Sequence, residues 1–215
     1  MAIATHTRVQ TQNVGLIEYR AGIALQNELH QKILTEGAPS TLLLLEHPSV
    51  YTAGRRTAPE DRPSNGVPVI DVDRGGKITW HGPGQLVGYP IVKLKEPTKV
   101  VDFVRALERA LIASLNQFGI EAIQICENSG VWIEDELGKR KIAAIGIRVA
   151  KGIVTHGFAL NVNPDLTFFE QIIPCGIPDV VTTSMSKELN REISVGEVLP
   201  IVAFEMEKEF EKVIA

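Results

Sequence analysis

Cysteine is scarce in this sequence of 215 residues, which holds only Cys126 and Cys175. Two cysteines do not make a disulfide framework, and they fall short of the close set of Cys and His ligands that a structural zinc site uses. The first 13 residues are polar and lack the apolar core of a signal peptide. We therefore expect reduced thiols, a cytoplasmic protein, and no metal or other cofactor.

Long hydrophobic runs and a strong charge of one sign are also missing. No apolar stretch reaches the ~20 residues that a membrane-spanning helix needs. The formal net charge is −4, so nothing indicates bulk attraction to nucleic acid or to a membrane surface. Any charged partner must meet a local patch of side chains.

Hydrophobic periodicity predicts an α+β fold, because adjacent short strands are separated by a few helices. We expect one domain over residues 1–215, with a mostly antiparallel sheet and flanking helices. The predicted helices lie at residues 19–35 and 104–118 and after the capping box Ser194–Glu197, with Pro200 kinking or delaying the last one. The predicted strands lie at residues 41–46, 69–72, 86–92, 120–125, 131–133, 141–149 and 153–162. Residues 51–68 are rich in Gly, Pro and charge and are predicted to form a loop.

A glycine-rich segment at residues 74–84 is the first unusual feature. Glycines let the backbone approach a ligand closely, and Trp80 beside them could wall an apolar pocket. The segment lacks the Gly-Lys-Ser/Thr ending of a Walker loop and the Gly-x-Gly-x-x-Gly spacing of a dinucleotide site. An ordinary loop between two strands remains the alternative.

Cys175 lies in the turn Pro-Cys-Gly-Ile-Pro, which favours presentation of the thiol over burial. A thiol becomes a nucleophile when a neighbour takes its proton. Burial as a small apolar side chain is the alternative for Cys175. Cys126 follows an apolar strand and is interpreted as structural.

Lys141 opens an apolar strand, where partial desolvation would make its amine a usable base. A solvated lysine at the end of a strand is the alternative. In the next strand, Gly157 suggests a bulge or a close approach to a ligand. His156 beside it fits a hydrogen-bonded core histidine.

Five stretches together resemble the lipoyl(octanoyl) transferases of protein lipoylation. They are LLLLEHPSVYTAGRRT (42–57), DRGGKITWHGPGQLVGYPI (73–91), KIAAIGIRV (141–149), HGFALNV (156–162) and PCGI (174–177). They spread from residue 42 to residue 177, and several are long and specific. No departure falls at a position that matters for the chemistry.

The resemblance implies the fold of the biotin and lipoate protein ligases. It implies that Cys175 is the acyl-thioester nucleophile and Lys141 its partner base. It further implies a set of substrate-binding residues: Arg74, Gly75, Gly76, Lys77, Ile78, Thr79, Trp80, His81, Ala144, Ile145, Gly146, Gly157, Phe158 and Ala159.

The implied reaction moves an octanoyl or lipoyl group from acyl carrier protein to a lysine of lipoyl domains or of a glycine-cleavage H-type protein. An apolar slot walled by Trp80, Ile145 and Phe158 would hold the acyl tail. Basic side chains would guide an acidic carrier protein: Arg55, Arg56, Arg62, Arg74 and Lys77. An ATP-dependent ligase of the same fold, a non-catalytic binding protein and a cysteine hydrolase are the competing interpretations.

Overall fold

The computed structural model describes residues 9–173 and 181–215. Within them, the strands of the larger sheet follow the order β1-β2-β6-β10-β9-β8-β7, and β11 pairs with β9 off this path. The bounds of these strands are Gln10–Leu16 (β1), Thr41–Glu46 (β2), Gln85–Ile91 (β6), Ile123–Ile125 (β7), Asn128–Asp135 (β8), Gly138–Ala150 (β9), Ile153–Asn161 (β10) and Val181–Thr182 (β11). Most neighbours pair antiparallel, and the β1–β2 and β11–β9 pairs are parallel. The predicted α+β class with a mostly antiparallel sheet is therefore confirmed.

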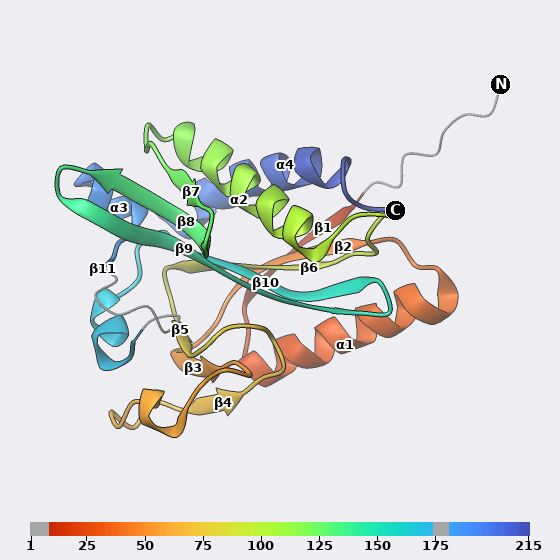
Figure 1. Cartoon of the computed structure of the whole chain (residues 1–215), viewed down its shortest axis with the longest axis horizontal. Helices are drawn as coiled ribbons and strands as arrows, with labels where there is room; N and C mark the ends of the chain where they lie inside the picture. Colours follow the sequence, from red (N-terminus) through yellow and green to blue (C-terminus); the bar gives the residue numbers. More distant parts are fainter. Residues whose placement is uncertain (1–8, 174–180) are drawn as a thin grey trace.

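Helices cover both faces of this sheet (Figure 1). Helices α2 (Val100–Asn116) and α4 (Val195–Phe210) pack on one face, and α1 (Tyr19–Glu36) packs on the other. Strand β2 shows why two layers are needed. Its alternate leucines, Leu42 and Leu44, join the core under α2 and α4, while Leu43 and Leu45 join the core under α1. A strand buried on both faces reads as a continuous apolar run, as this one does.

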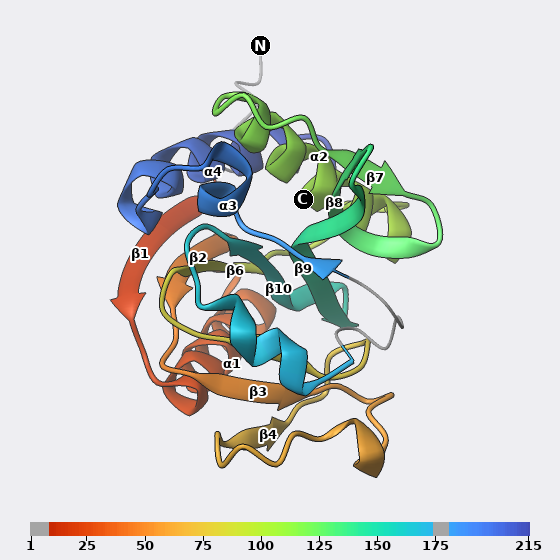
Figure 2. The same ribbon diagram turned by 90° about the vertical axis from the view of Figure 1, so that its left-hand side faces the viewer.

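A second, smaller sheet forms beside the first, with the order β4-β3-β5; Figure 1 labels its three strands, and Figure 2 shows β3 and β4 side by side. Its strands span Val50–Ala53 (β3), Val69–Asp71 (β4) and Thr79–His81 (β5). The prediction of a loop from residue 51 was wrong at its start, because β3 occupies the first three positions. The 3₁₀ helices η1 (Pro59–Asp61) and η2 (Leu166–Gln171) flank this sheet, and the short helix α3 (Met185–Leu189) follows β11.

Local signals place several element ends where the sequence predicts them. Lys151 and Gly152 both have positive φ, at 54° and 76°, and they turn β9 into β10. The Ser194 hydroxyl accepts a hydrogen bond from the amide of Glu197, and the Glu197 carboxylate accepts one from the amide of Ser194. These two bonds form the predicted capping box. Helix α4 begins directly after this cap and continues through Pro200, so the expected delay does not occur. Among the described residues, no helix has the length and apolar character needed to cross a membrane.

Candidate active site

Residues 74–78 of the glycine-rich segment form a loop that Arg74 holds in shape, whereas Thr79–His81 form strand β5. The Arg74 guanidinium donates to the backbone oxygens of Gly75 and Lys77, each at 2.9 Å. It also donates to the carbonyl oxygen and the hydroxyl of Thr52 on β3, at 2.7 and 2.9 Å. A Cβ atom at Gly54 would lie 2.4 Å from the Gly76 oxygen, so only glycine permits this close contact between the loop and β3. Arg74 is therefore a structural brace for the loop.

Small residues on β9 and β10 form the surface that faces this loop. Gly146 pairs with Gly157 and Ala144 pairs with Ala159 across the two strands. The amide of Gly75 donates to the Ile147 oxygen at 3.2 Å, which fastens the loop to β9. A Cβ atom at Gly157 would lie 2.0 Å from the Gly88 oxygen, so the predicted close approach at this glycine is an approach of the neighbouring strand β6.

Lys141 lies on β9 and is 5% exposed, so the alternative of a solvated strand-end lysine is wrong. Its Nζ lies 4.9 Å from the centroid of the Trp132 ring on β8. Its backbone oxygen accepts from the amide of Thr183 at 2.9 Å. The structure thus holds Lys141 in a largely buried position beside an aromatic ring.

A cavity of about 280 Å³ lies between the glycine-rich loop and the β9–β10 surface. Thirteen of the residues predicted from the sequence line it: Arg74, Gly75, Gly76, Lys77, Thr79, His81, Lys141, Ala144, Ile145, Gly146, Gly157, Phe158 and Ala159. Segments that lie far apart in the sequence therefore meet around one concave space. Cys175 lies outside the described residues.

Ile78 and Trp80 were also expected to bind substrate, but neither is among the residues that line this cavity. Both belong to a separate apolar cluster with Tyr51 and Phe169. The Trp80 ring stacks on Phe168 with centroids 4.8 Å apart. Trp80 therefore fastens the smaller sheet to η2, behind the loop that faces the cavity.

Aromatic and polar rings that the sequence did not single out line the cavity as well. Tyr19 at the start of α1 and Tyr89 on β6 belong to its wall, and so do residues 127–129 at the start of β8. The Tyr89 hydroxyl donates to His47 Nε2 at 2.7 Å, while His47 Nδ1 donates to the Ile17 oxygen at 2.7 Å. No motif surrounds Tyr19, which reaches the site only because α1 packs across the sheet.

His81 is a neutral histidine in this wall. Burial, together with the nearby His47 and Arg74, lowers the pKa of His81 to about 3. Its Nδ1 donates to Gln85 Oε1 at 2.7 Å, and the Gln85 amide donates onward to Asn161 Oδ1 at 2.9 Å. The imidazole therefore acts near pH 7 as an uncharged member of a hydrogen-bonded chain.

His156 has φ of 57° in the middle of β10, a conformation that non-glycine residues seldom adopt. Burial lowers the pKa of His156 even though its Nε2 donates to Asp73 Oδ1 at 2.8 Å. Its backbone amide donates to Gln26 Oε1 on α1 at 2.7 Å. The prediction of a hydrogen-bonded core histidine holds for Nε2 only, because Nδ1 is buried without a hydrogen-bond partner among the described residues. His156 also lines the cavity.

Only part of the predicted basic patch faces solvent. Arg74 is buried, whereas Arg62 is exposed beside Asp71 and Lys77 is half-buried beside Asp61 at 3.3 Å. Arg55 and Arg56 are exposed, and Arg56 lines the cavity.

Cys126, interpreted from the sequence as a structural residue, is exposed after β7. Burial therefore gives no support to that interpretation.

Comparison with known proteins agrees with this architecture. The model of the lipoyl protein ligase A/B catalytic domain matches residues 18–207. An octanoyltransferase of Salinispora arenicola is 54% identical over 190 residues, which cover 87% of this chain and 89% of the relative. A putative lipoate protein ligase of Thermoplasma acidophilum has a TM-score of 0.70 at 14% identity, over 94% of this chain and 85% of that one. A biotin protein ligase of Aquifex aeolicus has a TM-score of 0.53 at 15% identity, over 94% and 71%.

The fold is that of the lipoate and biotin protein ligases, and the match over residues 18–207 places the chain in the lipoyl protein ligase A/B family. Within that family, its curated relatives are octanoyltransferases over most of its length. The chain is therefore an enzyme, and its class is that of the acyltransferases.

Proposed function

We propose that the chain transfers an octanoyl or lipoyl group from acyl carrier protein to the target lysine of lipoyl domains and of the glycine-cleavage H-type protein. The group would travel as a thioester on Cys175, and Lys141 would act as the partner base. This reaction would be the first step of endogenous protein lipoylation in the cytoplasm. The whole of residues 1–215 would form one catalytic domain that needs no cofactor.

The buried Lys141 in the wall of the cavity is the observation that carries the proposal. Lys141 is 5% exposed and lines the cavity, with its Nζ 4.9 Å from the centroid of the Trp132 ring, so its amine lies where the proposed reaction would take place. Strand β11 runs alongside it: Val181 pairs with Arg140 and Thr182 pairs with Lys141. Cys175 precedes Val181 by six residues, so the chain that carries the thiol leads directly to a strand fixed beside Lys141.

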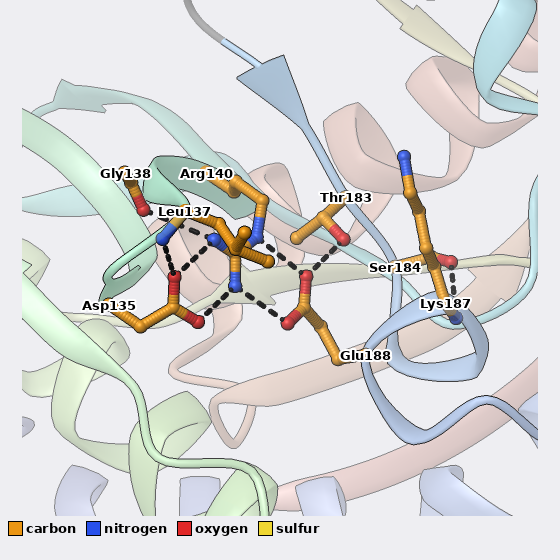
Figure 3. Close-up of polar contacts among 8 residues, drawn as sticks. All are labelled: Asp135, Leu137, Gly138, Arg140, Thr183, Ser184, Lys187 and Glu188. Atoms are coloured by element: carbon orange, nitrogen blue, oxygen red, sulfur yellow. Dashed lines mark hydrogen bonds and ion pairs between the residues drawn. The ribbon is translucent and has the colours of Figure 1, made fainter.

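Arg140 fastens this strand in place (Figure 3). Its guanidinium contacts Asp135 through two bonds of 2.7 Å and Glu188 of α3 through two bonds of 2.9 Å. Glu188 also accepts from the Thr183 hydroxyl at 2.5 Å. Paired bonds between a guanidinium and carboxylates restrict orientation as well as distance. The link between β9 and α3 supports a fixed spacing between Lys141 and the end of β11.

The proposed chemistry follows from thioester and amide energetics. The Cys175 sulfur attacks the donor carbonyl, a new carbon–sulfur bond forms, and the carrier leaves as a thiol. One thioester replaces another, so this step is close to neutral in energy. The acceptor amine then attacks the Cys175 thioester, its carbon–sulfur bond breaks, and a more stable amide forms. In the first step Lys141 takes the proton of the Cys175 thiol and gives it to the leaving carrier thiolate; in the second it takes a proton of the amine and gives it to the Cys175 thiolate. No ATP enters this sequence.

The walls of the cavity suit an acyl tail. Ile145 and Phe158 offer apolar side chains, and the glycines and alanines of β9 and β10 leave room beside them. The lowered pKa of His81 leaves its imidazole uncharged near neutral pH. Each buried methylene of the acyl group would contribute ~0.8 kcal/mol to binding. Several kcal/mol of affinity would therefore come from the tail.

Arg55 and Arg56 are the basic residues proposed to meet the acidic carrier. Both are exposed, and Arg56 reaches the edge of the cavity where the carrier's thioester would enter. Charges of this kind act mainly on the rate and specificity of encounter.

The intact mass of the protein tests the proposal. The pure protein is mixed with octanoyl-acyl carrier protein without ATP, beside its Cys175→Ser and Cys126→Ser variants. An octanoyl adduct that survives Cys126→Ser and is released by hydroxylamine supports the thioester. If lipoyl-domain modification instead requires ATP and free octanoate, the chain acts as a ligase. If neither reaction occurs, it acts as a binding protein.

A further inference from the structure

The register between β8 and β9 changes at Lys141. Val131 pairs with Ala143, but the next residue, Trp132, pairs with Lys141. Ile142 therefore has no partner on β8, which is the arrangement of a β-bulge. With regular pairing, Trp132 would lie opposite Ile142, and Lys141 would lie opposite Ile133. A shift of one residue moves a side chain to the other face of a strand, so the bulge places Lys141 and Trp132 on the same face.

Trp132 forms a wall beside the lysine amine. The ring is 2% exposed, and its centroid lies 4.9 Å from Lys141 Nζ. The face of an indole attracts an ammonium group at this distance, most strongly where water is excluded. The ring is itself fixed, because its Nε1 donates to the Asn128 oxygen at 3.2 Å. Asn128 in turn lines the cavity.

Gly130 leaves the space in which the lysine side chain lies. A Cβ atom at this position would be 2.5 Å from the Ala143 oxygen, 2.7 Å from Lys141 Cε and 3.3 Å from Lys141 Nζ, so the glycine admits both the β9 backbone and the lysine side chain. The φ of Gly130 is 122°, which L side chains rarely adopt. Its amide donates at 2.9 Å to Glu108 Oε1, and Glu108 is fully buried on α2. Helix α2 therefore fixes the backbone on which the lysine methylenes rest.

We propose that Trp132 and Gly130 are positioning residues for Lys141. Trp132 fixes the amine and Gly130 admits the side chain, so that one rotamer of a flexible four-carbon chain reaches the cavity. With the side chain already held in this geometry, the reaction does not have to lose the entropy of ordering the base. The inference rests on the proposed role of Lys141 as the base, although the geometry itself can be measured without any reaction.

Two substitutions of Trp132 distinguish the effect of its aromatic ring from the effect of its size. Trp132→Met keeps a large apolar side chain without a ring, and Trp132→Phe keeps a ring. We expect Trp132→Met to lower kcat for octanoyl transfer by about 10- to 100-fold with KM changed less than about twofold, because a displaced base slows chemistry. Trp132→Phe should recover most of this loss. Ile133→Val, on the opposite face of β8, serves as the control and should leave kcat unchanged.

A double-mutant cycle shows whether Trp132 acts through the lysine. In a Lys141→Met background, Trp132→Met should cause no further loss of kcat, since the residue that it positions is gone. Equal losses from Trp132→Met in both backgrounds would overturn the proposal. A Trp132→Phe variant as impaired as Trp132→Met would overturn it as well.

The wild-type protein provides a measurement that no folding defect can obscure. A ring face close to an amine shifts the adjacent ε-methylene protons upfield in a lysine-selective NMR spectrum. One such shifted signal should be present, and it should vanish in Lys141→Met. Its absence would overturn the inference. If the signal is present but wild-type protein transfers no octanoyl group, the proposed function fails while the geometry stands.

Discussion

Acid should destabilise this fold through His81 by an amount that the structure allows one to estimate. The folded-state pKa of His81 is about 3, because burial and the nearby His47 and Arg74 disfavour the imidazolium. In the unfolded chain the pKa of the imidazole returns to its ordinary value of 6.5. Below pH 6.5 the imidazole therefore becomes protonated in the unfolded state while it stays neutral in the folded state. The free energy of unfolding decreases as the pH falls through this range.

The size of this effect follows from linkage. One proton of difference changes the free energy of unfolding by about 1.4 kcal/mol per pH unit. Between pH 7.5 and pH 5, His81 alone should thus remove about 2 kcal/mol. Other groups titrate in the same range, so the effect must be read as a difference between wild type and a His81→Gln variant.

Urea unfolding at pH 7.5, 6 and 5 measures this difference. His81→Gln should be the less stable protein at pH 7.5, where the Gln85 and Thr52 contacts of the imidazole are lost. As the pH falls, the free energy of unfolding of the variant should then decrease less steeply than that of wild type. The difference in slope should correspond to the uptake of about one proton, or about 1.4 kcal/mol per pH unit. Parallel slopes for the two proteins between pH 6 and pH 5 would refute the assignment of a neutral, buried His81.

Three further perturbations test other parts of the site. Lys141→Ala should lower the rate of octanoyl transfer by about 10²- to 10⁴-fold, the usual contribution of a positioned base, and an undiminished single-turnover rate would refute that role. Arg55→Ala with Arg56→Ala should raise KM for the carrier-bound donor and weaken its salt dependence, whereas a change in kcat alone would contradict a docking role. Arg140→Gln should cost about 1.5–3 kcal/mol in the free energy of unfolding at pH 7, because it removes charge-assisted bonds to Glu188. Hydrogen bonding to Arg140 holds the pKa of Glu188 below 4.5, so this loss should shrink as pH falls through that lowered value, as urea melts at pH 7 and pH 3 would show.

Elements with their own local signals were predictable from the sequence. Strand β2 begins and ends at the predicted residues, because a short run of leucines between Pro39 and Pro48 is typical of a strand buried on both faces. Helix α1 matches within one residue, and its C-terminal Gly37 adopts a φ of 65°. Strand β1 escaped prediction because it lies mostly exposed at the sheet edge, where polar residues such as Gln10 and Asn13 carry no alternation.

Side chains whose surroundings come from distant parts of the chain were not predictable. The glycines next to Trp80 led to the prediction that it walls a pocket. Its ring instead contacts Phe168 and Phe169, which lie far along the chain in η2. The sequence places Lys141 at the start of a strand, but β9 begins three residues earlier, at Gly138. The register shift that pairs Trp132 with Lys141 then turns the lysine inward. Tyr19 enters the cavity only through the packing of α1 on the sheet. Register and packing decide these positions, and neither is local in sequence.

The central claim is that this enzyme carries an acyl group on Cys175 and needs no ATP to pass it on. The most direct measurement is a chase: octanoylated protein, freed of donor, is mixed with a lipoyl domain alone, and both masses are followed with time. The account predicts that the protein loses the octanoyl mass at the rate at which the lipoyl domain gains it, with the new group on its lysine. An acylated protein that keeps its mass, or a lipoyl domain that is modified only after ATP is added, would contradict the account.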